Sequence, residues 1–257
     1  MPKLRAQIVW KPKKQKSGPK RPGNCCVCYS LLLCNTSDMD LASYIDHTLL
    51  KVDCTESDIR KLCEEAVQYK FAAVCVPPFF VPMVRQYFDS VHSPVKVATV
   101  VGFPLGYSNT PAKVEEIKRA IDDGADEIDG VINICAVKSK QWGFVQNDID
   151  SMCTAVRLRG KKIKIILETA LLTQEELEKL SEILLLTLPD FAKTSTGFNG
   201  GGATLEAVQI LQHLLGNKIA IKASGGIRSR EQAEAYIVAG VQRIGTSAGV
   251  QMMQKSE

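Results

Sequence analysis

The sequence lacks a long apolar run, and its cysteines lack paired spacing. No segment of the 257-residue chain approaches the roughly 20 consecutive apolar residues of a membrane-spanning helix, so we expect no membrane partner. Several of the nine cysteines lie singly in stretches that resemble core elements, namely Cys54, Cys63, Cys75, Cys135 and Cys153. This scatter argues against a disulfide framework and predicts a reducing, cytoplasmic location.

A recognisable metal site is also missing. Cys25, Cys26, Cys28 and Cys34 form a local cluster that could hold a metal, but no histidine or second cysteine pair lies nearby to complete a usual zinc pattern. Farther along the chain, no histidine or carboxylate cluster has the spacing of a metal-ligand set. We therefore expect no bound metal.

Acidic residues are absent from the first 22 positions, which hold eight Lys and Arg, whereas the remainder carries a net charge of minus four. The segment KPKKQKSGPKRPG is rich in Lys, Pro and Gly and has no apolar periodicity. We expect residues 1–40 to be a disordered basic extension that precedes one domain over residues 41–257. We favour a merely solvated segment. The alternative is that this extension binds nucleic acid or acts as a targeting segment. The apolar run YSLLLC is too short and too late for a secretory signal.

Beyond residue 41, short β-rich runs alternate with amphipathic helical patterns. The strand candidates are residues 42–50, 72–78, 96–104, 127–134, 162–169, 191–197, 219–226 and 243–249. Clear helical patterns occupy residues 55–69, 110–124, 173–185 and 229–240, several of them opening with a Ser or Thr cap. Eight strand-then-helix units predict a closed parallel (β/α)8 TIM barrel. A doubly wound open sheet is the alternative, but IDHTLLK lacks the glycine-rich turn usual after its first strand.

Strand parity then indicates which side chains face the barrel lumen, because alternate residues point inward and outward. In KIKIILET, an apolar outer face leaves Lys164, Ile166 and Glu168 facing inward. The same alternation turns Asp129 and Lys222 inward. Asp46 and Thr48 share a parity that could add them to this set. Several charged side chains therefore converge on one lumen. They could form a functional site, or they could be purely structural ion pairs that fill the core.

Lys193 and Lys222 lie near the carboxyl ends of their strands, where barrel active sites are built. Two lysines about 4 Å apart, at an effective dielectric constant near 20, repel by roughly 4 kcal/mol, or about three pKa units. Such repulsion would bring Lys193 toward a neutral, nucleophilic amine that can form a Schiff base with a carbonyl. Asp129, alone or through a water, is positioned to move the protons, and Lys222 can share this work.

The last strands indicate what the substrate carries. ASGGIR and GTSAG each end a strand in glycines and small hydroxyls just before a helix, which leaves backbone amides free to bind a phosphate. In barrels, the loops after strands seven and eight are the common place for such a site. TSTG and the following GFNGGGAT add a third glycine-rich loop at the same end. We therefore predict a phosphorylated small-molecule substrate.

These motifs resemble one family. IDHTLL, GADEID with VINI, KIILET, FAKTSTGF, GGAT, IKASGGIR and RIGTSAG, in this order and spacing, are similar to deoxyribose-phosphate aldolase, a class I aldolase, from about Ser43 to Gly249. The resemblance implies reversible cleavage of 2-deoxy-D-ribose 5-phosphate to glyceraldehyde 3-phosphate and acetaldehyde, with no metal and no organic cofactor. It also places the enzyme in deoxyribonucleotide catabolism, and we expect a homo-oligomer, a dimer or a tetramer.

The resemblance also implies roles for single residues. Lys193 would be the Schiff-base lysine, Lys222 would perturb it, and Asp129 would relay protons. The positions expected to contact the substrate or its phosphate are Asp46, Thr48, Lys164, Thr196, Gly197, Gly225, Gly226, Gly245 and Ser247.

Three features depart from the family pattern. Residues 1–40 do not match it. Gly130 replaces a bulkier apolar residue beside Asp129, and the sequence printed ends in QMMQKSE without the C-terminal tyrosine of some members. Two other functions stay open: a transaldolase-like Schiff-base enzyme acting on a longer sugar phosphate, and a non-catalytic role in which the basic extension binds RNA or a partner. Nucleic acid is the less favoured partner.

Overall fold

The computed structural model describes residues 40–254. Apart from Asp40, the predicted basic extension and its cysteine cluster lie outside the described residues, as do the last three positions of the chain. Among the described helices, none is both long and apolar enough to cross a membrane.

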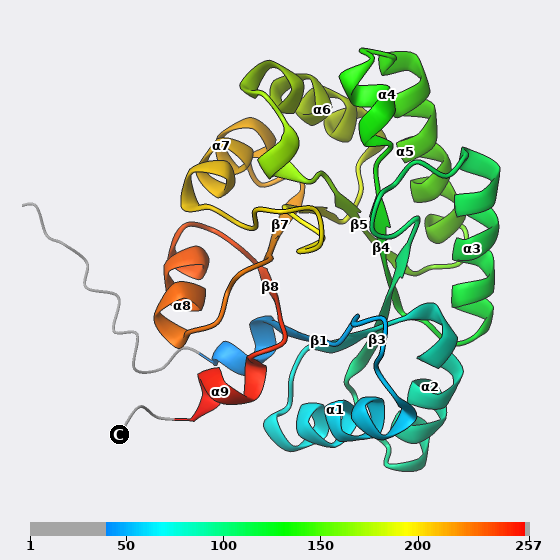
Figure 1. Ribbon diagram of the computed structural model, residues 1–257, viewed down its shortest axis with the longest axis vertical. Helices are drawn as coiled ribbons and strands as arrows, with labels where there is room; N and C mark the ends of the chain where they lie inside the picture. Colours follow the sequence, from blue (N-terminus) through cyan, green and yellow to red (C-terminus); the bar gives the residue numbers. More distant parts are fainter. Residues whose placement is uncertain (1–39, 255–257) are drawn as a thin grey trace, which may run out of the picture. The chain divides into compact units, whose positions relative to one another are not determined.

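Eight parallel strands close into a barrel in sequence order, which confirms the predicted fold (Figure 1). The strands are β1 (Ile45–Thr48), β2 (Ala73–Val76), β3 (Lys96–Val101), β4 (Glu127–Val131), β5 (Lys162–Ile166), β6 (Phe191–Lys193), β7 (Ala220–Ser224) and β8 (Arg243–Thr246). β8 pairs with β1, so that the sheet has no free edge.

Helices surround the strands. They are α1 (Glu56–Tyr69), α2 (Val81–Ser90), α3 (Thr110–Asp122), α4 (Ile134–Lys138), α5 (Trp142–Arg157), α6 (Gln174–Thr187), α7 (Leu205–Leu215), α8 (Arg230–Val238) and α9 (Gly249–Met253). Short 3-10 turns occupy Leu41–Tyr44, Pro78–Phe80 and Thr169–Leu171. Capping boxes at Thr55, Thr173 and Ser229 start α1, α6 and α8, because each side chain satisfies a backbone N–H that the first helical turn leaves free.

The apolar core lies mainly between the strands and the helices. Ile128, Ile163, Ile165 and Ile221 point outward into this layer, as the alternation predicted. A second, small cluster lies inside the barrel and consists of Ala73, Cys75, Ala98 and Val100 on β2 and β3. Small side chains on this half of the lumen leave its interior to the charged side chains of the other strands.

Gly130 has a packing explanation. Its missing side chain would point at α5, where an added Cβ would lie 3.0 Å from the sulfur of Met152. Met152 is fully buried and fills the space that a larger residue on β4 would occupy. The strand therefore continues unbroken through Asp129, and the departure from the family pattern leaves the register of β4 with β5 intact.

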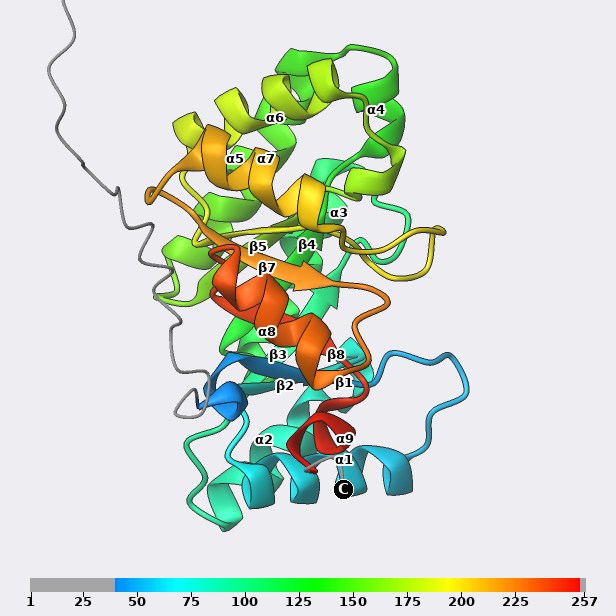
Figure 2. The same cartoon turned by 90° about the vertical axis from the view of Figure 1, so that its left-hand side faces the viewer.

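The loops after β1, β6 and β7 project from the same end of the barrel, as the side view in Figure 2 shows. This is the end at which the strands finish, and it is where TIM-barrel sites are built. The loop after β7 is tied to β8 by the Thr246 hydroxyl, which donates to the carbonyl of Ile227 at 2.7 Å.

Candidate active site

Three lysines on consecutive strands meet one aspartate inside the barrel. Lys193 on β6 lies beside Lys222 on β7 in the strand register, and Lys164 projects from β5. The Nζ atoms of Lys193 and Lys222 both lie 2.7 Å from Oδ2 of Asp129, and Nζ of Lys164 lies 2.8 Å from its Oδ1. The sequence-predicted convergence of these four side chains therefore occurs in the structure.

A second carboxylate contacts the same lysines. Lys222 Nζ lies 2.5 Å from Oδ2 of Asp46 on β1, which is fully buried. Asp46 also accepts a hydrogen bond from the guanidinium of Arg243 on β8. The structure thus places Asp46 among the buried charged groups of the barrel lumen.

Glu127 and Arg243 complete this group, and the sequence reasoning missed both. Arg243 Nη2 lies 2.8 Å from Oε1 of Glu127, and Lys164 Nζ lies 2.6 Å from Oε2 of Glu127, as an ion pair without hydrogen-bond geometry. Parity could have found them, since Glu127 precedes Asp129 by two positions and Arg243 precedes Gly245 by two.

These contacts set the charges of the carboxylates and of Lys222. Burial favours a neutral Asp129, but Lys164, Lys193 and Lys222 outweigh it and hold its pKa well below the usual range. Burial likewise opposes ionisation of Asp46, yet the surrounding cations lower its pKa to about 2. Lys222 is the converse case: burial acts to lower its pKa, but Asp129 and Asp46 raise it overall. Both aspartates are ionised at neutral pH, and Lys222 keeps its proton.

Lys193 differs from the other two lumen lysines. Burial lowers its pKa, Asp129 opposes this, and Lys222 adds to the lowering, so that the net direction is downward. Asp129 cannot hold Lys193 protonated as strongly as an exclusive partner would, because it serves three amines. Lys222 therefore lowers the pKa of Lys193, as the sequence predicts, but burial is the larger cause of the lowering.

A cavity of about 250 Å³ opens above Lys193 at the carboxyl ends of the strands. Of the sequence-predicted positions, its lining includes Thr48, Lys193, Thr196, Gly197, Gly225, Gly226, Gly245 and Ser247. It also includes two cations that the sequence reasoning did not select, Lys51 and Arg228. Lys222, Asp129, Asp46 and Lys164 are not part of the lining and lie below it. Lys193 is the amine of the charged cluster that reaches the cavity.

The cavity wall formed by the loops after β7 and β8 can accept an anion. Among the described residues, the backbone N–H groups of Gly225, Gly226 and Ser247 donate to no backbone carbonyl. Arg228 adds a positive charge to the same wall. Free amides beside a cation are the groups that bind phosphate oxygens.

Gly245 has a packing role beside the phosphate contact that the sequence predicts. A Cβ at this position would lie 2.9 Å from the Cβ of Ser224 and 3.1 Å from Cε of Lys222. The glycine therefore gives the Lys222 side chain room to cross the lumen toward Asp46 and Asp129. It borders the cavity and also permits the ion pairs beneath it.

Lys164 and Thr196 also lie in surroundings that limit direct contact with a substrate. The ammonium of Lys164 is fully buried, and although burial opposes its charge, Asp129, Glu127 and Asp46 raise its pKa. Thr196 borders the cavity, but its hydroxyl and its backbone N–H both point to the carboxylate of Glu168. Thr48 lines the cavity, with its hydroxyl donating to the carbonyl of Asp46 at 2.8 Å.

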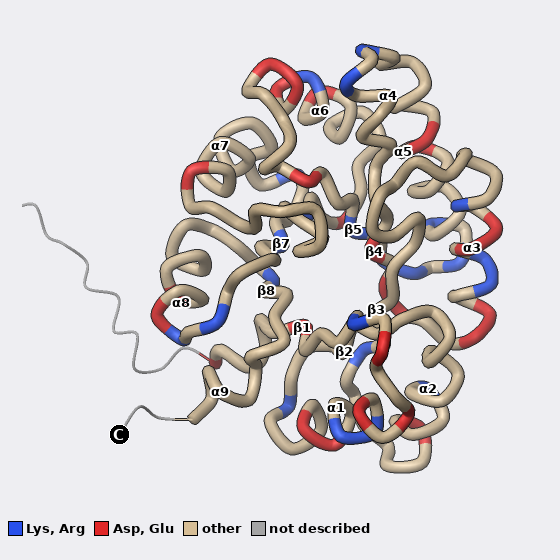
Figure 3. The backbone as a smooth tube through the Cα atoms, in the orientation of Figure 1, with Lys and Arg blue, Asp and Glu red and all other residues tan. Residues whose placement is uncertain are grey.

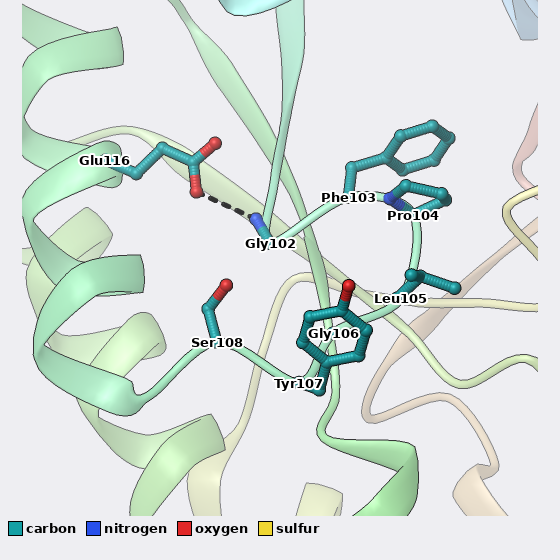
Figure 4. Close-up of a pocket in the computed structure, with 8 residues that line it drawn as sticks. All are labelled: Gly102, Phe103, Pro104, Leu105, Gly106, Tyr107, Ser108 and Glu116. Atoms are coloured by element: carbon teal, nitrogen blue, oxygen red, sulfur yellow. Dashed lines mark hydrogen bonds between the residues drawn. The ribbon is translucent and has the colours of Figure 1, made fainter.

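A second cavity, of about 300 Å³, lies between the loop 102–108 and α3 (Figure 4). Glu116 accepts a hydrogen bond from the N–H of Gly102 at 2.9 Å there, and burial raises the pKa of this carboxyl group. The residues that line this cavity include no lysine or arginine, so it offers neither an amine nucleophile nor a cation for a phosphate. The cavity above Lys193 is the better candidate active site.

Comparisons with known proteins agree with this geometry. Residues 41–255 match the DeoC/LacD family of aldolases. The chain is 49% identical over 216 residues to deoxyribose-phosphate aldolase of Thermococcus gammatolerans, covering 84% of this chain and 96% of that protein. It is 48% identical over 216 residues to deoxyribose-phosphate aldolase of Finegoldia magna, covering 84% of this chain and 100% of that protein.

Solved structures give the same result. The tetrameric deoxyribose phosphate aldolase of Aeropyrum pernix superposes with a TM-score of 0.77 at 32% identity, covering 82% of this chain and 88% of that one. An aldolase called QR15 superposes with a TM-score of 0.77 at 39% identity, covering 82% of this chain and 93% of that one. The resemblance inferred from the motifs is therefore confirmed, and the chain belongs to the DeoC/LacD aldolase family.

Proposed function

We propose that this protein is a class I deoxyribose-phosphate aldolase, which reversibly cleaves 2-deoxy-D-ribose 5-phosphate to D-glyceraldehyde 3-phosphate and acetaldehyde. The observation that carries the proposal is one buried lysine, Lys193, whose lowered pKa and position at the cavity floor suit a Schiff-base nucleophile. The relatives named above bear the name of this activity.

The first step forms a covalent bond. The neutral amine of Lys193 attacks C1 of the open-chain sugar, and the resulting carbinolamine takes up a proton and loses water to give a protonated imine. An amine with a free lone pair is required for this attack. Lys193 can still donate a hydrogen bond to Asp129 at 2.7 Å while neutral, which orients the lone pair away from that carboxylate.

The second step breaks the bond between C2 and C3. A base removes the proton of the C3 hydroxyl, C3 becomes the aldehyde carbon of glyceraldehyde 3-phosphate, and the bonding electrons pass into the imine to form an enamine. Protonation of the enamine at C2 and hydrolysis then release acetaldehyde and restore the amine of Lys193. Each proton removed is returned, so that no external oxidant or reductant is consumed.

Two groups below Lys193 suit the proton transfers. Asp129 is ionised and can accept a proton directly or through a water, and Lys222 is protonated and can donate one. Their contact at 2.7 Å lets a proton lost by Lys222 be replaced from the same network. We propose these roles for Asp129 and Lys222, as the motif resemblance implied.

We further propose that the substrate phosphate binds the free amides of Gly225, Gly226 and Ser247. The opposite end of the sugar would then reach Lys193, because these residues line one cavity. A homo-oligomer is also proposed, since the related Aeropyrum pernix enzyme is described as tetrameric. A reducing, cytoplasmic location fits the described cysteines, which are free thiols.

Borohydride trapping tests the proposal. The enzyme is incubated with 2-deoxyribose 5-phosphate, reduced with borohydride, digested, and mapped by mass spectrometry. We expect the label on the peptide that contains Lys193, and we expect Lys193→Ala to lose both label and turnover. A label on Lys164 or Lys222 would refute the assignment. Transfer of a three-carbon ketone unit from a longer ketose phosphate, with no cleavage of 2-deoxyribose 5-phosphate, would instead indicate a transaldolase-like enzyme.

A further inference from the structure

The charged side chains below the cavity form a closed ring of alternating sign. In order around the ring they are Asp129, Lys164, Glu127, Arg243, Asp46 and Lys222, and the last contacts the first. We call these six residues the lumen ring. Both charge signs are visible on the strands that surround the barrel interior in Figure 3.

The lumen ring is electrically neutral by itself. It contains three carboxylates and three cations, and each carboxylate contacts at least two of the cations. Burial opposes the charges of Lys164 and Arg243, but their carboxylate partners raise the pKa of both groups, so they stay protonated. Lys193 is a seventh titratable position, and it contacts the ring through Asp129. Protonation of Lys193 would leave the lumen with one excess positive charge.

The other titratable groups around Lys193 lie outside the lumen ring. Burial raises the pKa of the Cys75 thiol on β2 to about 11, so it is neutral, and β3 presents Ala98 and Val100 to the lumen. Glu168, which follows β5, is hydrogen-bonded to Thr196 and Asn199 in the next loop. Lys51 and Arg228 line the cavity above Lys193 and are exposed, so water and salt screen their charges.

We propose that Glu127 and Arg243 are positioning residues that set the protonation state of Lys193 through the charge balance of the lumen ring. Both lie at the first position of their strands, at the end of the barrel opposite to the cavity, where charged residues usually serve stability alone. Neither lines the cavity, so they act on Lys193 through Asp46, Lys164 and Asp129. The proposal rests on the proposed function, in which Lys193 reacts as a free amine.

Changing one ring charge should move the pKa of Lys193. A unit charge about 10 Å away, at an effective dielectric constant near 20, shifts a pKa by roughly one unit. Arg243→Gln removes a positive charge, which favours protonated Lys193 and raises its pKa. Glu127→Gln removes a negative charge and lowers it. The double variant restores a neutral ring and should return the pKa to near its original value.

The pH dependence of kcat/KM measures this effect, because it reports the pKa values of the free enzyme. Activity needs neutral Lys193, so it falls as the pH drops through the pKa of Lys193. We expect the acidic limb to move about one unit toward alkaline pH in Arg243→Gln, about one unit toward acidic pH in Glu127→Gln, and back in the double variant. Arg243→Lys keeps the charge and should leave the limb near its original position.

Asp148→Asn is a matched control. Asp148 on α5 pairs with Lys113 on α3 at 2.7 Å, and both side chains are buried in the helix layer, outside the barrel lumen. Breaking this ion pair should lower the stability without moving the acidic limb. A limb that moves as far in this variant as in the lumen-ring variants would mean that any loss of a buried charge acts on Lys193, and the proposal would be overturned.

Two further outcomes would overturn it. The first is an unshifted limb, with only a lower plateau, in folded Arg243→Gln and Glu127→Gln. The second is a double variant that folds although neither single variant does, which would assign the pair to folding alone. Trapping of the unmodified enzyme separates these failures from a failure of the proposed function: without a label on Lys193 the nucleophile is wrong, whereas a labelled Lys193 with unshifted limbs rejects the charge balance only.

Discussion

Glu168 and Thr196 join two loops at the rim of the cavity. The carboxylate of Glu168 accepts a hydrogen bond of 2.5 Å from the Thr196 hydroxyl and lies 3.2 Å from its backbone nitrogen. Glu168 reaches this position because its backbone is left-handed, with φ 58° and ψ 57°, just beyond the end of β5. Asn199 adds a third donor to the same carboxylate and also binds the carbonyl of Pro104, which connects the loop after β3.

We predict that Glu168→Gln weakens substrate binding more than it slows the reaction. The amide cannot accept from all three donors, so the loop that carries Thr196 and Gly197 loses its anchor. Loss of one hydrogen bond to a charged group costs about 1.5 kcal/mol or more, which corresponds to roughly a tenfold rise in KM for deoxyribose 5-phosphate. Steady-state kinetics measure this. Glu178→Gln, an exposed change on α6, is the control. A fall in kcat as large as the rise in KM would contradict an anchoring role.

Strand parity allowed much of this site to be predicted from the sequence. Lys164, Lys222 and Asp129 sit on runs whose alternate residues are apolar, so the direction of each side chain followed from its neighbours. Glu127 and Arg243 were missed although the predicted strands begin at these residues, because both lie at the amino ends of their strands, whereas barrel active sites are built at the carboxyl ends.

Contacts across loops could not be predicted in this way. Thr196 was expected to contact substrate because its motif matched, yet its donors are directed to Glu168, 28 positions earlier. That contact depends on the left-handed backbone at Glu168, a conformation that residues other than glycine and asparagine rarely adopt. Arg228 lies in a motif that was noted for its glycines, but its place in the cavity follows from the path of the loop after β7.

The phosphate site can be tested with a change that adds a negative charge. Gly226 has φ +79°, and no atom lies within 4 Å of the position of an added Cβ, so the side chain of Gly226→Asp would enter open space at the cavity wall. Repulsion between this carboxylate and the phosphate should raise KM for deoxyribose 5-phosphate at least about tenfold. Gly226→Ala carries the same backbone strain without the charge and serves as the control.

The comparison that decides this prediction is between two substrates. Unphosphorylated deoxyribose has no anion to repel, so its KM should change by the same factor in Gly226→Asp and Gly226→Ala. An equal loss of activity toward both substrates in the aspartate variant, measured by acetaldehyde release, would mean that the loop after β7 is only structural.

Removal of metals should leave the activity unchanged. In the proposed mechanism, the protonated imine on Lys193 draws electrons from the breaking bond, so no metal ion is needed to polarise the carbonyl. The measurement is the initial rate of glyceraldehyde 3-phosphate formation before and after dialysis against a chelator. A loss of rate that a divalent cation restores would point to a metal-dependent aldolase.

Lys222 offers a direct test of like-charge repulsion at Lys193. Because Lys222 shares Asp129 with Lys193 and stays protonated, Lys222→Leu should raise the pKa of Lys193 and move the acidic limb of kcat/KM toward alkaline pH by one unit or more, on the order of 1.4 kcal/mol per unit. Lys222→Arg keeps the charge with a larger head group, so the limb should stay nearer to its original pH even if crowding at Gly245 lowers the rate. An unshifted limb in the leucine variant, with only a lower plateau, would show that Lys222 donates protons and that burial alone depresses the pKa of Lys193.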